Sequence, residues 1–384
     1  MVANTWIAAG PGDWDDDGNW SLGHSPIAGE DPTFDGTSVN NCNANDDTPT
    51  GVLTIAAGYT GTIIQSSDMY ISGYSQSGGT FTGDTMKWIY LSGNFVKNAG
   101  SMTAWVTNLN IIGNSVHSTT GGGQIHFRTV KINDAFKFTA GGGGSNYINV
   151  LSFINNGILE IPTGTFFNNY CGTGHGYINN GTIYSNGSFN ILLNSFDITI
   201  NMGIINGNLY VKNPYTSGDR TLILNSNCDN YLLKIYIVGI TKLASIDPNG
   251  HNLTADSITV GPRGILQCGE GTITTTSLDS SAGTITPETA TWVFDDAATV
   301  NVAAGQELHS VIVKDRLKLL SNLGIEQALA HTNPVDLNGF ALTLDRPDNE
   351  YTSIRRPMRR AIRKLDLGPM GALDRWMTDL GGVV

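Results

Sequence analysis

Residues 154–161 read INNGILEI, and residues 178–184 repeat the pattern as INNGTIY. A looser copy, INGNLYV, follows at residues 205–211, so the copies start 24 and then 27 residues apart. Each copy joins an Asn/Gly turn to a short run rich in strand-forming residues. A turn-and-strand repeat with a period in the twenties is typical of stacked coils, in which each unit buries its apolar face only against its neighbours. The stretch therefore predicts a β-solenoid.

The composition favours strands and turns over helices. The chain has 384 residues, of which 47 are glycine, and 14% of its residues are charged against about 25% in ordinary domains. Its 40% hydrophobic content excludes a disordered chain. Asparagine and glycine both tolerate the positive φ that tight corners require, and asparagines at equivalent turns can stack into hydrogen-bonded ladders. We therefore expect structural roles for the repeated asparagines.

The first 50 residues are predicted to cap the solenoid. This short segment contains three large apolar side chains, those of Trp6, Trp14 and Trp20. A solenoid must cover its first coil, because an open end exposes core and unpaired strand edges. Residues 12–23, GDWDDDGNWSLG, are followed by prolines and aspartates. This segment resembles the opening of phage-associated and bacterial surface β-helix proteins, in which a W…NWS…P…D pattern precedes the repeats.

Two later phrases share a D-x-N-G-x-x-L-T pattern, DPNGHNLT at 247–254 and DLNGFALT at 336–343. Each predicts a β-turn followed by a half-buried strand, and both resemble repeats of the same group of proteins. The expected fold is all-β, a right-handed parallel β-helix. Its expected parts are a Trp-rich cap over 1–50, a solenoid body over 51–350 and a short α-helical tail over 351–384.

The tail differs from the body in charge and pattern. Residues 351–384 hold seven basic and three acidic side chains, a net of +4, which leaves −16 for residues 1–350. Met358, Ile362 and Leu365 are spaced as on an amphipathic helix, and a second such helix follows Pro369. The tail fits a cap on the last coil, a docking peptide for an acidic partner, or an amphipathic membrane anchor. The docking residues would be Arg355, Arg356, Arg359, Arg360, Arg363, Lys364, Leu373, Trp376 and Met377.

The acidic loop at residues 13–18 has two interpretations. Asp13, Asp15 and Asp17 match the start of an EF-hand-type calcium loop. The twelfth position of such a loop needs a bidentate acid, and here it is His24. The loop is thus either a calcium site or a solvated acidic turn between packed tryptophans. Calcium is the one cofactor that the sequence suggests.

Few residues are suited to catalysis. Glycoside hydrolysis needs two carboxylates about 5 to 10 Å apart, and acids are sparse between residues 51 and 250, where Glu160, Asp197 and Asp229 are the best candidates. We find no nucleophile, phosphate-loop or dinucleotide motif. The cysteines, Cys42, Cys171, Cys228 and Cys268, lack metal-site spacing and are expected to be small buried residues.

Several aromatic residues could stack on sugar rings, although core packing and ladder stacking explain them as well. They are Tyr70, Tyr74, Trp88, Tyr90, Trp105, Tyr147, Tyr170, Tyr177 and Tyr184.

The expected function is structural and non-enzymatic. A net charge of −12 argues against nucleic-acid binding, and no apolar run is long enough to span a membrane. The first residues lack the features of a signal peptide, so we expect that the chain is made and kept in a host cytoplasm until assembly, or that it reaches the outside without a cleaved signal. The resemblance implies a bacteriophage virion protein, such as a head decoration, fibre or tail appendage, that docks on other virion proteins through its tail. A homotrimer and contacts with host glycans are compatible with this role. The alternatives are a tailspike-like polysaccharide depolymerase and a bacterial surface adhesin.

Overall fold

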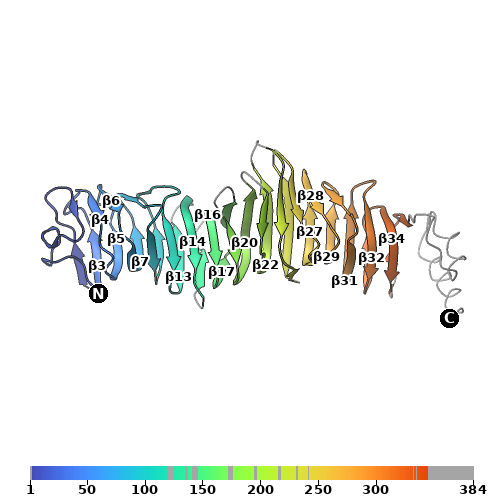
Figure 1. The fold of residues 1–384 in the computed structure, drawn as a ribbon, viewed down its shortest axis with the longest axis horizontal. Coiled ribbons are helices and arrows are strands. Elements are labelled where there is room, and N and C mark those ends of the chain that lie inside the picture. Colours follow the sequence, from blue (N-terminus) through green and yellow to red (C-terminus); the bar gives the residue numbers. More distant parts are fainter. Residues whose placement is uncertain are drawn as a thin grey trace, which may run out of the picture. The chain divides into compact units, whose positions relative to one another are not determined.

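The computed structural model (Figure 1) describes most of residues 2–344. The ranges and residues outside the description are 1, 120–123, 135–136, 141–145, 172–175, 194–196, 215–217, 231, 241, 332, 334 and 345–384, together with the side chains of Asn146 and Asp229. The helices expected over 351–384, and with them the docking residues of the tail, therefore lie outside the described residues.

The described chain is all-β and forms a parallel β-solenoid, as the repeats predict. Its one helical segment is a 3₁₀ turn, η1 (Asp17–Asn19). The paired strands of the described chain are parallel to one another, as a coil that always turns in one direction requires. The chain divides into two compact units, Met1–Ser195 with Asn201–Leu209, and Phe196–Ile200 with Tyr210–Val384.

The first unit holds β1 to β20 and the start of β22. They are β1 (Val2–Thr5), β2 (Gly12–Asp13), β3 (Glu30–Phe34), β4 (Cys42–Ala44), β5 (Thr50–Ile55), β6 (Thr62–Gln65), β7 (Met69–Gln76), β8 (Thr80–Thr82), β9 (Trp88–Leu91), β10 (Phe95–Lys97), β11 (Ser101–Met102), β12 (Asn108–Ile111), β13 (Ser115–Thr119), β14 (Gln124–Ile132), β15 (Lys137–Ala140), β16 (Asn146–Asn155), β17 (Ile158–Ile161), β18 (Thr165–Cys171), β19 (Tyr177–Asn179), β20 (Thr182–Leu193) and β22 (Ile204–Asn213).

The second unit holds the remaining strands. They are β21 (Ile198–Ile200), β23 (Arg220–Leu224), β24 (Cys228–Asp229), β25 (Leu233–Gly239), β26 (Ala244–Asp247), β27 (Leu253–Val260), β28 (Gly264–Gln267), β29 (Thr272–Ser280), β30 (Thr284–Thr286), β31 (Thr291–Val302), β32 (Glu307–Val313), β33 (Arg316–Leu319), β34 (Leu323–His331), β35 (Val335–Asp336) and β36 (Leu342–Leu344).

The first two sequence repeats stack in register, as predicted. Ile154 and Asn155 pair with Ile178 and Asn179, and Leu159 pairs with Ile183. The two buried asparagines form a ladder, because Asn155 Nδ2 donates to Asn179 Oδ1 at 2.8 Å. The repeat thus places Leu159 and Ile183 in the core and a buried amide pair at the corner, while Ile154 is half-buried and Ile178 exposed.

The third copy does not fold as predicted. Asn206 and Gly207 lie inside β22 instead of forming its turn. The corner above Asn179 is made by Met202 and Gly203, since Asn179 Nδ2 donates to Met202 O at 2.8 Å. Gly203 has φ +57°, and a side chain there would lie 2.3 Å from Asn179 O. Only glycine fits this close approach, which explains the shifted corner.

The N-terminal tryptophans pack into one aromatic cluster. The rings of Trp6 and Trp14 lie 5.2 and 4.9 Å from that of Trp20, and Phe34 lies below all three. Trp20 Nε1 donates to Trp14 O at 2.7 Å. Trp6 and Trp20 also form an antiparallel bridge, so the segment around Trp20 covers the outer edge of the first coil. Covering that edge removes the unpaired strand groups that would invite association.

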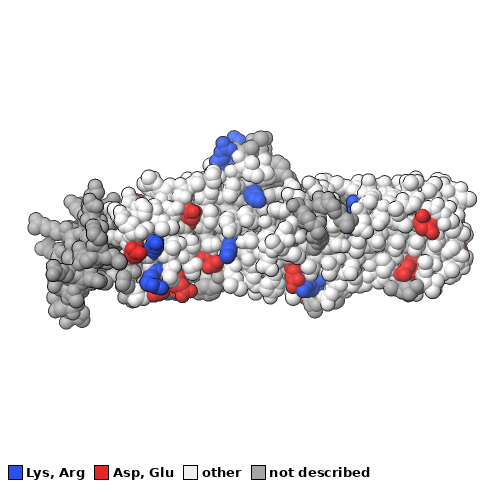
Figure 2. All heavy atoms as spheres, turned by 180° about the vertical axis from the view of Figure 1, so that it is seen from behind, with Lys and Arg blue, Asp and Glu red and all other residues white. Residues whose placement is uncertain are grey.

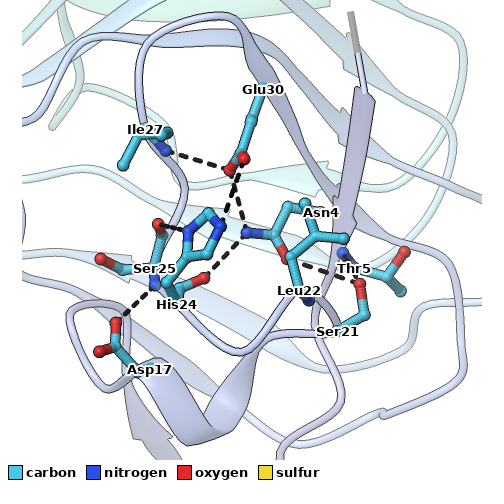
Figure 3. A network of polar contacts seen from close by, with 9 residues as sticks. All are labelled: Asn4, Thr5, Asp17, Ser21, Leu22, His24, Ser25, Ile27 and Glu30. Carbon is cyan, nitrogen blue, oxygen red and sulfur yellow. Dashed lines mark hydrogen bonds and ion pairs between the residues drawn. The ribbon is translucent and has the colours of Figure 1, made fainter.

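A polar network supports this segment (Figure 3). The buried Asn4 amide donates to His24 O at 2.9 Å and Glu30 Oε2 at 3.2 Å, and accepts from Leu22 N. His24 Nε2 lies 3.5 Å from Glu30 Oε1. His24, the residue at the twelfth position of the acidic loop, thus pairs with a carboxylate of the cap.

The D-x-N-G phrases of the second unit form the predicted turns. In the first, Asn249 N donates to Asp247 Oδ1 at 2.7 Å, and Asn249 and Gly250 both have positive φ. The second repeats this arrangement with Asp336, Asn338 and Gly339. Each turn leads into a strand, β27 or β36. The four cysteines are buried, as expected, and none of them forms a disulfide.

Candidate functional site

Trp105 lies in the loop after β11 with φ +65°, a conformation that bulky residues rarely adopt. Its ring meets His126 edge-on with centroids 4.5 Å apart, and Tyr170 with centroids 5.3 Å apart. His126 is on β14 and Tyr170 on β18, with β16 paired between these strands. Neighbouring strands are about 4.8 Å apart. The indole therefore reaches across β16, from His126 on β14 to Tyr170 on β18.

Three asparagines, Asn149, Asn168 and Asn190, form a column on this side of the unit, which we call the amide column. They pair in register from β16 through β18 to β20. Each is flanked by residues that point into the core, so alternation directs it outward. They are nevertheless only 1%, 9% and 2% exposed. Neighbouring atoms therefore cover an outward-facing row of amides. The Trp105 ring contacts His126, which pairs in register with Asn149, and Tyr170, two residues after Asn168.

The amide column is hydrogen-bonded internally and has an unpartnered, buried polar atom at each end. Asn190 Nδ2 donates to Asn168 Oδ1, and Asn168 Nδ2 donates to Asn149 Oδ1, each at 2.8 Å. Asn149 Nδ2 and Asn190 Oδ1 have no hydrogen-bond partner among the described residues, and neither has His126 Nδ1. A buried polar atom without a partner costs about 1–3 kcal/mol, so such atoms mark a place where a further group can bind.

His126 pairs in register with Asn149, so its ring is next to the open donor of the column. Burial lowers the pKa of His126, which keeps its imidazole neutral at neutral pH. In the tautomer protonated on Nε2, Nδ1 is an acceptor. Burial also raises the pKa of Tyr170, so its hydroxyl stays protonated. The Trp105 site, defined as Trp105, His126, Tyr170 and the amide column, offers aromatic surface together with an adjacent donor and acceptor.

This combination suits a carbohydrate. A hydroxyl group can both accept from Asn149 Nδ2 and donate to His126 Nδ1. Both atoms are buried in this structure, so a ligand reaches them only when the side chains that cover them move. The C–H faces of a sugar ring are apolar and pack on aromatic rings. Sites for small ligands generally pair such apolar walls with a few placed polar groups. The residues of the Trp105 site can supply apolar contact, a hydrogen-bond donor and a hydrogen-bond acceptor to a bound ligand.

The carboxylates considered for catalysis have structural partners. Glu160 Oε1 pairs with Lys137 Nζ at 2.6 Å, and Glu160 Oε2 accepts from Thr139 at 3.3 Å. In the second unit Asp197 Oδ1 accepts from Thr221 N at 2.7 Å. The side chain of Asp229 is outside the described residues. The three remain predictions as catalytic residues.

The acidic loop holds its carboxylates apart by hydrogen bonds to different residues. Within the described chain no three His, Cys, Asp or Glu side chains come together as a metal site would need. Calcium binding at this loop stays a prediction. The contacts are Asn43 Nδ2 to Asp13 Oδ1, Asn45 Nδ2 to Asp15 Oδ1 and Ser25 N to Asp17 Oδ1, each at 2.8 Å.

The aromatic candidates separate into core and surface. Tyr74 and Tyr177 are buried in the core. Tyr70 and Tyr90 stack on each other at 4.3 Å, apart from the Trp105 site. Trp105 and Tyr170 are the members of the predicted set that meet at the Trp105 site. Sequence reasoning missed His126 and the amide column, whose members recur 19 and 22 residues apart, out of step with the repeats.

In the described part of the chain, no helix is long and apolar enough to cross a membrane. No family model, curated protein or solved structure matches the chain.

Proposed function

We propose that this chain is a structural component of a bacteriophage virion, a head decoration, fibre or tail appendage, and that it contacts host surface glycans through the Trp105 site. The virion role is supported by the resemblance of the first 40 residues and of the repeats to phage-associated solenoids. The parallel β-solenoid is compatible with it, and we take its coil to be right-handed.

One observation carries the glycan contact. The amide column ends in an unpartnered donor and an unpartnered acceptor, although Asn149 and Asn190 are almost fully buried. At the donor end lie the Trp105 ring and the acceptor His126 Nδ1. If the amide column served folding alone, the protein would be more stable with Asn149 Nδ2 and Asn190 Oδ1 paired, or with apolar residues in place of these asparagines. A ligand rich in hydroxyl groups supplies the missing partners.

The test is binding of the full chain to purified bacterial surface polysaccharides, measured with wild type and Trp105→Ala. Loss of a central aromatic contact is expected to weaken binding about tenfold or more. Tyr184→Ala is the matched control, because Tyr184 is a 44% exposed aromatic on the same unit with no contact to the Trp105 site. Equal binding by Trp105→Ala and wild type would refute the glycan contact at this site. Asn149→Ala gives a second test that leaves the aromatic surface intact.

The virion assignment is tested by locating the chain in native particles with gold-labelled antibody and electron microscopy. Labelling of phage heads or tails supports it. Labelling of the bacterial envelope would instead support the adhesin. Release of reducing sugar from bound polysaccharide would support the depolymerase.

We further propose that residues 351–384 dock the chain on other virion proteins, since a basic tail on an acidic body favours an acidic partner and a fixed orientation. Replacing Arg356, Arg359, Arg360 and Arg363 by Gln in the full chain is expected to abolish incorporation into particles, as is deletion of 351–384. Normal incorporation of both variants would contradict docking. Mass measurement of the free chain tests the proposed homotrimer.

A further inference from the structure

The strands that carry the Trp105 site differ in charge from the rest of the chain. β14, β16, β18 and β20 contain Arg128 and Lys131 and no Asp or Glu, although the chain as a whole has a net charge of −12. Charged side chains are few and scattered on the face drawn in Figure 2. Two cations without an acid on four adjacent strands therefore make this region locally positive.

Arg128 is placed beside the Trp105 loop. Its backbone N donates to Thr107 O at 2.8 Å, and Thr107 is two residues after Trp105. Phe127, which precedes Arg128, points into the core, and Arg128 itself is half-buried, so its side chain leaves the strand on the outer side with His126. The Arg128 backbone thus lies beside the loop that carries Trp105, and its side chain leaves β14 on the same face as His126, which contacts the indole.

Lys131 lies further along β14 between the buried Val130 and Ile132, so alternation also directs it outward. Among the described residues neither Lys131 nor Arg128 has a carboxylate partner. The nearest acids along the chain are Asp84, whose Oδ1 accepts from Met86 N at 2.6 Å, and Asp134, which follows the end of β14. The two cations therefore remain available to an anionic ligand.

We infer that the saccharide bound at the Trp105 site is acidic, with a sugar ring on Trp105, a hydroxyl between Asn149 and His126, and a carboxylate on Arg128. This inference rests on the proposed glycan contact. The planar guanidinium matches a carboxylate with two parallel hydrogen bonds, which an uncharged sugar cannot accept in the same way. Lys131 adds a longer-range attraction that salt screens.

The experiment compares polygalacturonate, alginate and hyaluronate with their methyl-esterified forms, which keep the sugars and remove the charge. Binding to the full chain is followed by calorimetry. We expect the acidic forms to bind about tenfold more tightly than the esters, as the loss of a charge-assisted hydrogen bond requires. Affinity for the acidic forms should fall as salt is raised.

Arg128→Gln should remove this preference and leave binding of the esters unchanged, while Arg316→Gln, an exposed arginine of the second unit, should leave both unchanged. If the acidic polysaccharides and their esters bind equally well, and Trp105→Ala abolishes binding of both, the inference is overturned. The proposed glycan contact would then still stand. Binding of polyglutamate as tight as that of the acidic sugars would also overturn it. Failure of every saccharide to bind would refute the glycan contact itself. The ester comparison needs no variant, so it holds even if Arg128→Gln does not fold.

Discussion

Asn179 joins two coils of the first unit, and its replacement by alanine tests whether the asparagine ladder stabilises the solenoid. The substitution removes the acceptor of Asn155 Nδ2 and the donor to Met202 O, two hydrogen bonds of 2.8 Å each. Asn155 Nδ2 is left with a 3.3 Å hydrogen bond to Thr182 O. Two lost bonds cost about 1 kcal/mol each, while Met202 O keeps a hydrogen bond of 3.3 Å from the Tyr177 hydroxyl. We expect the free energy of unfolding to fall by about 2 kcal/mol.

The neighbouring Asn180 provides a matched control. It is exposed, and the hydrogen bond that its side chain donates to Asn156 Oδ1 at 3.0 Å competes with water. Asn180→Ala should therefore change stability by less than about 0.5 kcal/mol. Urea unfolding measures both variants, and native-state hydrogen exchange at Asn180 and Gly181, whose amides donate to Asn155 O, reports local opening. Equal effects of the two substitutions would refute the ladder as a source of stability.

Three further predictions concern the cap, a core thiol and acid stability. Trp20→Ala should lower the free energy of unfolding by about 3–5 kcal/mol in thermal or urea unfolding, because it empties the centre of the aromatic cluster; an unchanged midpoint would show that the cluster does not stabilise the cap. Burial raises the pKa of Cys171 to about 12, so Ellman's reagent should label it only after unfolding, and rapid labelling of the native chain would contradict its burial. Burial lowers the pKa of His126 below 6.5 in the folded state, so the unfolded state binds the proton first as pH falls. Stability should therefore decline from about pH 6.5 downward, less steeply in His126→Gln, and identical pH profiles of the two proteins would disprove this contribution.

The parallel coil could be predicted because its signals are local and repeated. The first two repeats share apolar spacing and corner asparagines, and these residues meet in register. The D-x-N-G turns could be predicted for the same reason, since few residues accept the positive φ found at Asn249 and Asn338. The turn of the third repeat was predicted at the wrong residues, because the chain already turns at Gly203.

The Trp105 site could not be predicted, because its geometry depends on irregular features. The coils vary in length, so Asn149, Asn168 and Asn190 do not recur at the period of the repeats. The alternation of inward and outward residues also changes phase at corners. In β7 the consecutive residues Gly73 and Tyr74 are both buried. As a result Tyr70 points outward, whereas Tyr74, four residues later, is buried. The position of Trp105 follows from one loop residue with positive φ, which no periodic pattern records.

A structure of the full chain bound to a surface polysaccharide fragment of its host would test the proposed glycan contact most directly. The account predicts a sugar ring against Trp105, with one hydroxyl within hydrogen-bond distance of both Asn149 Nδ2 and His126 Nδ1. A fragment bound elsewhere on the chain, with Trp105, His126 and Asn149 untouched, would contradict it.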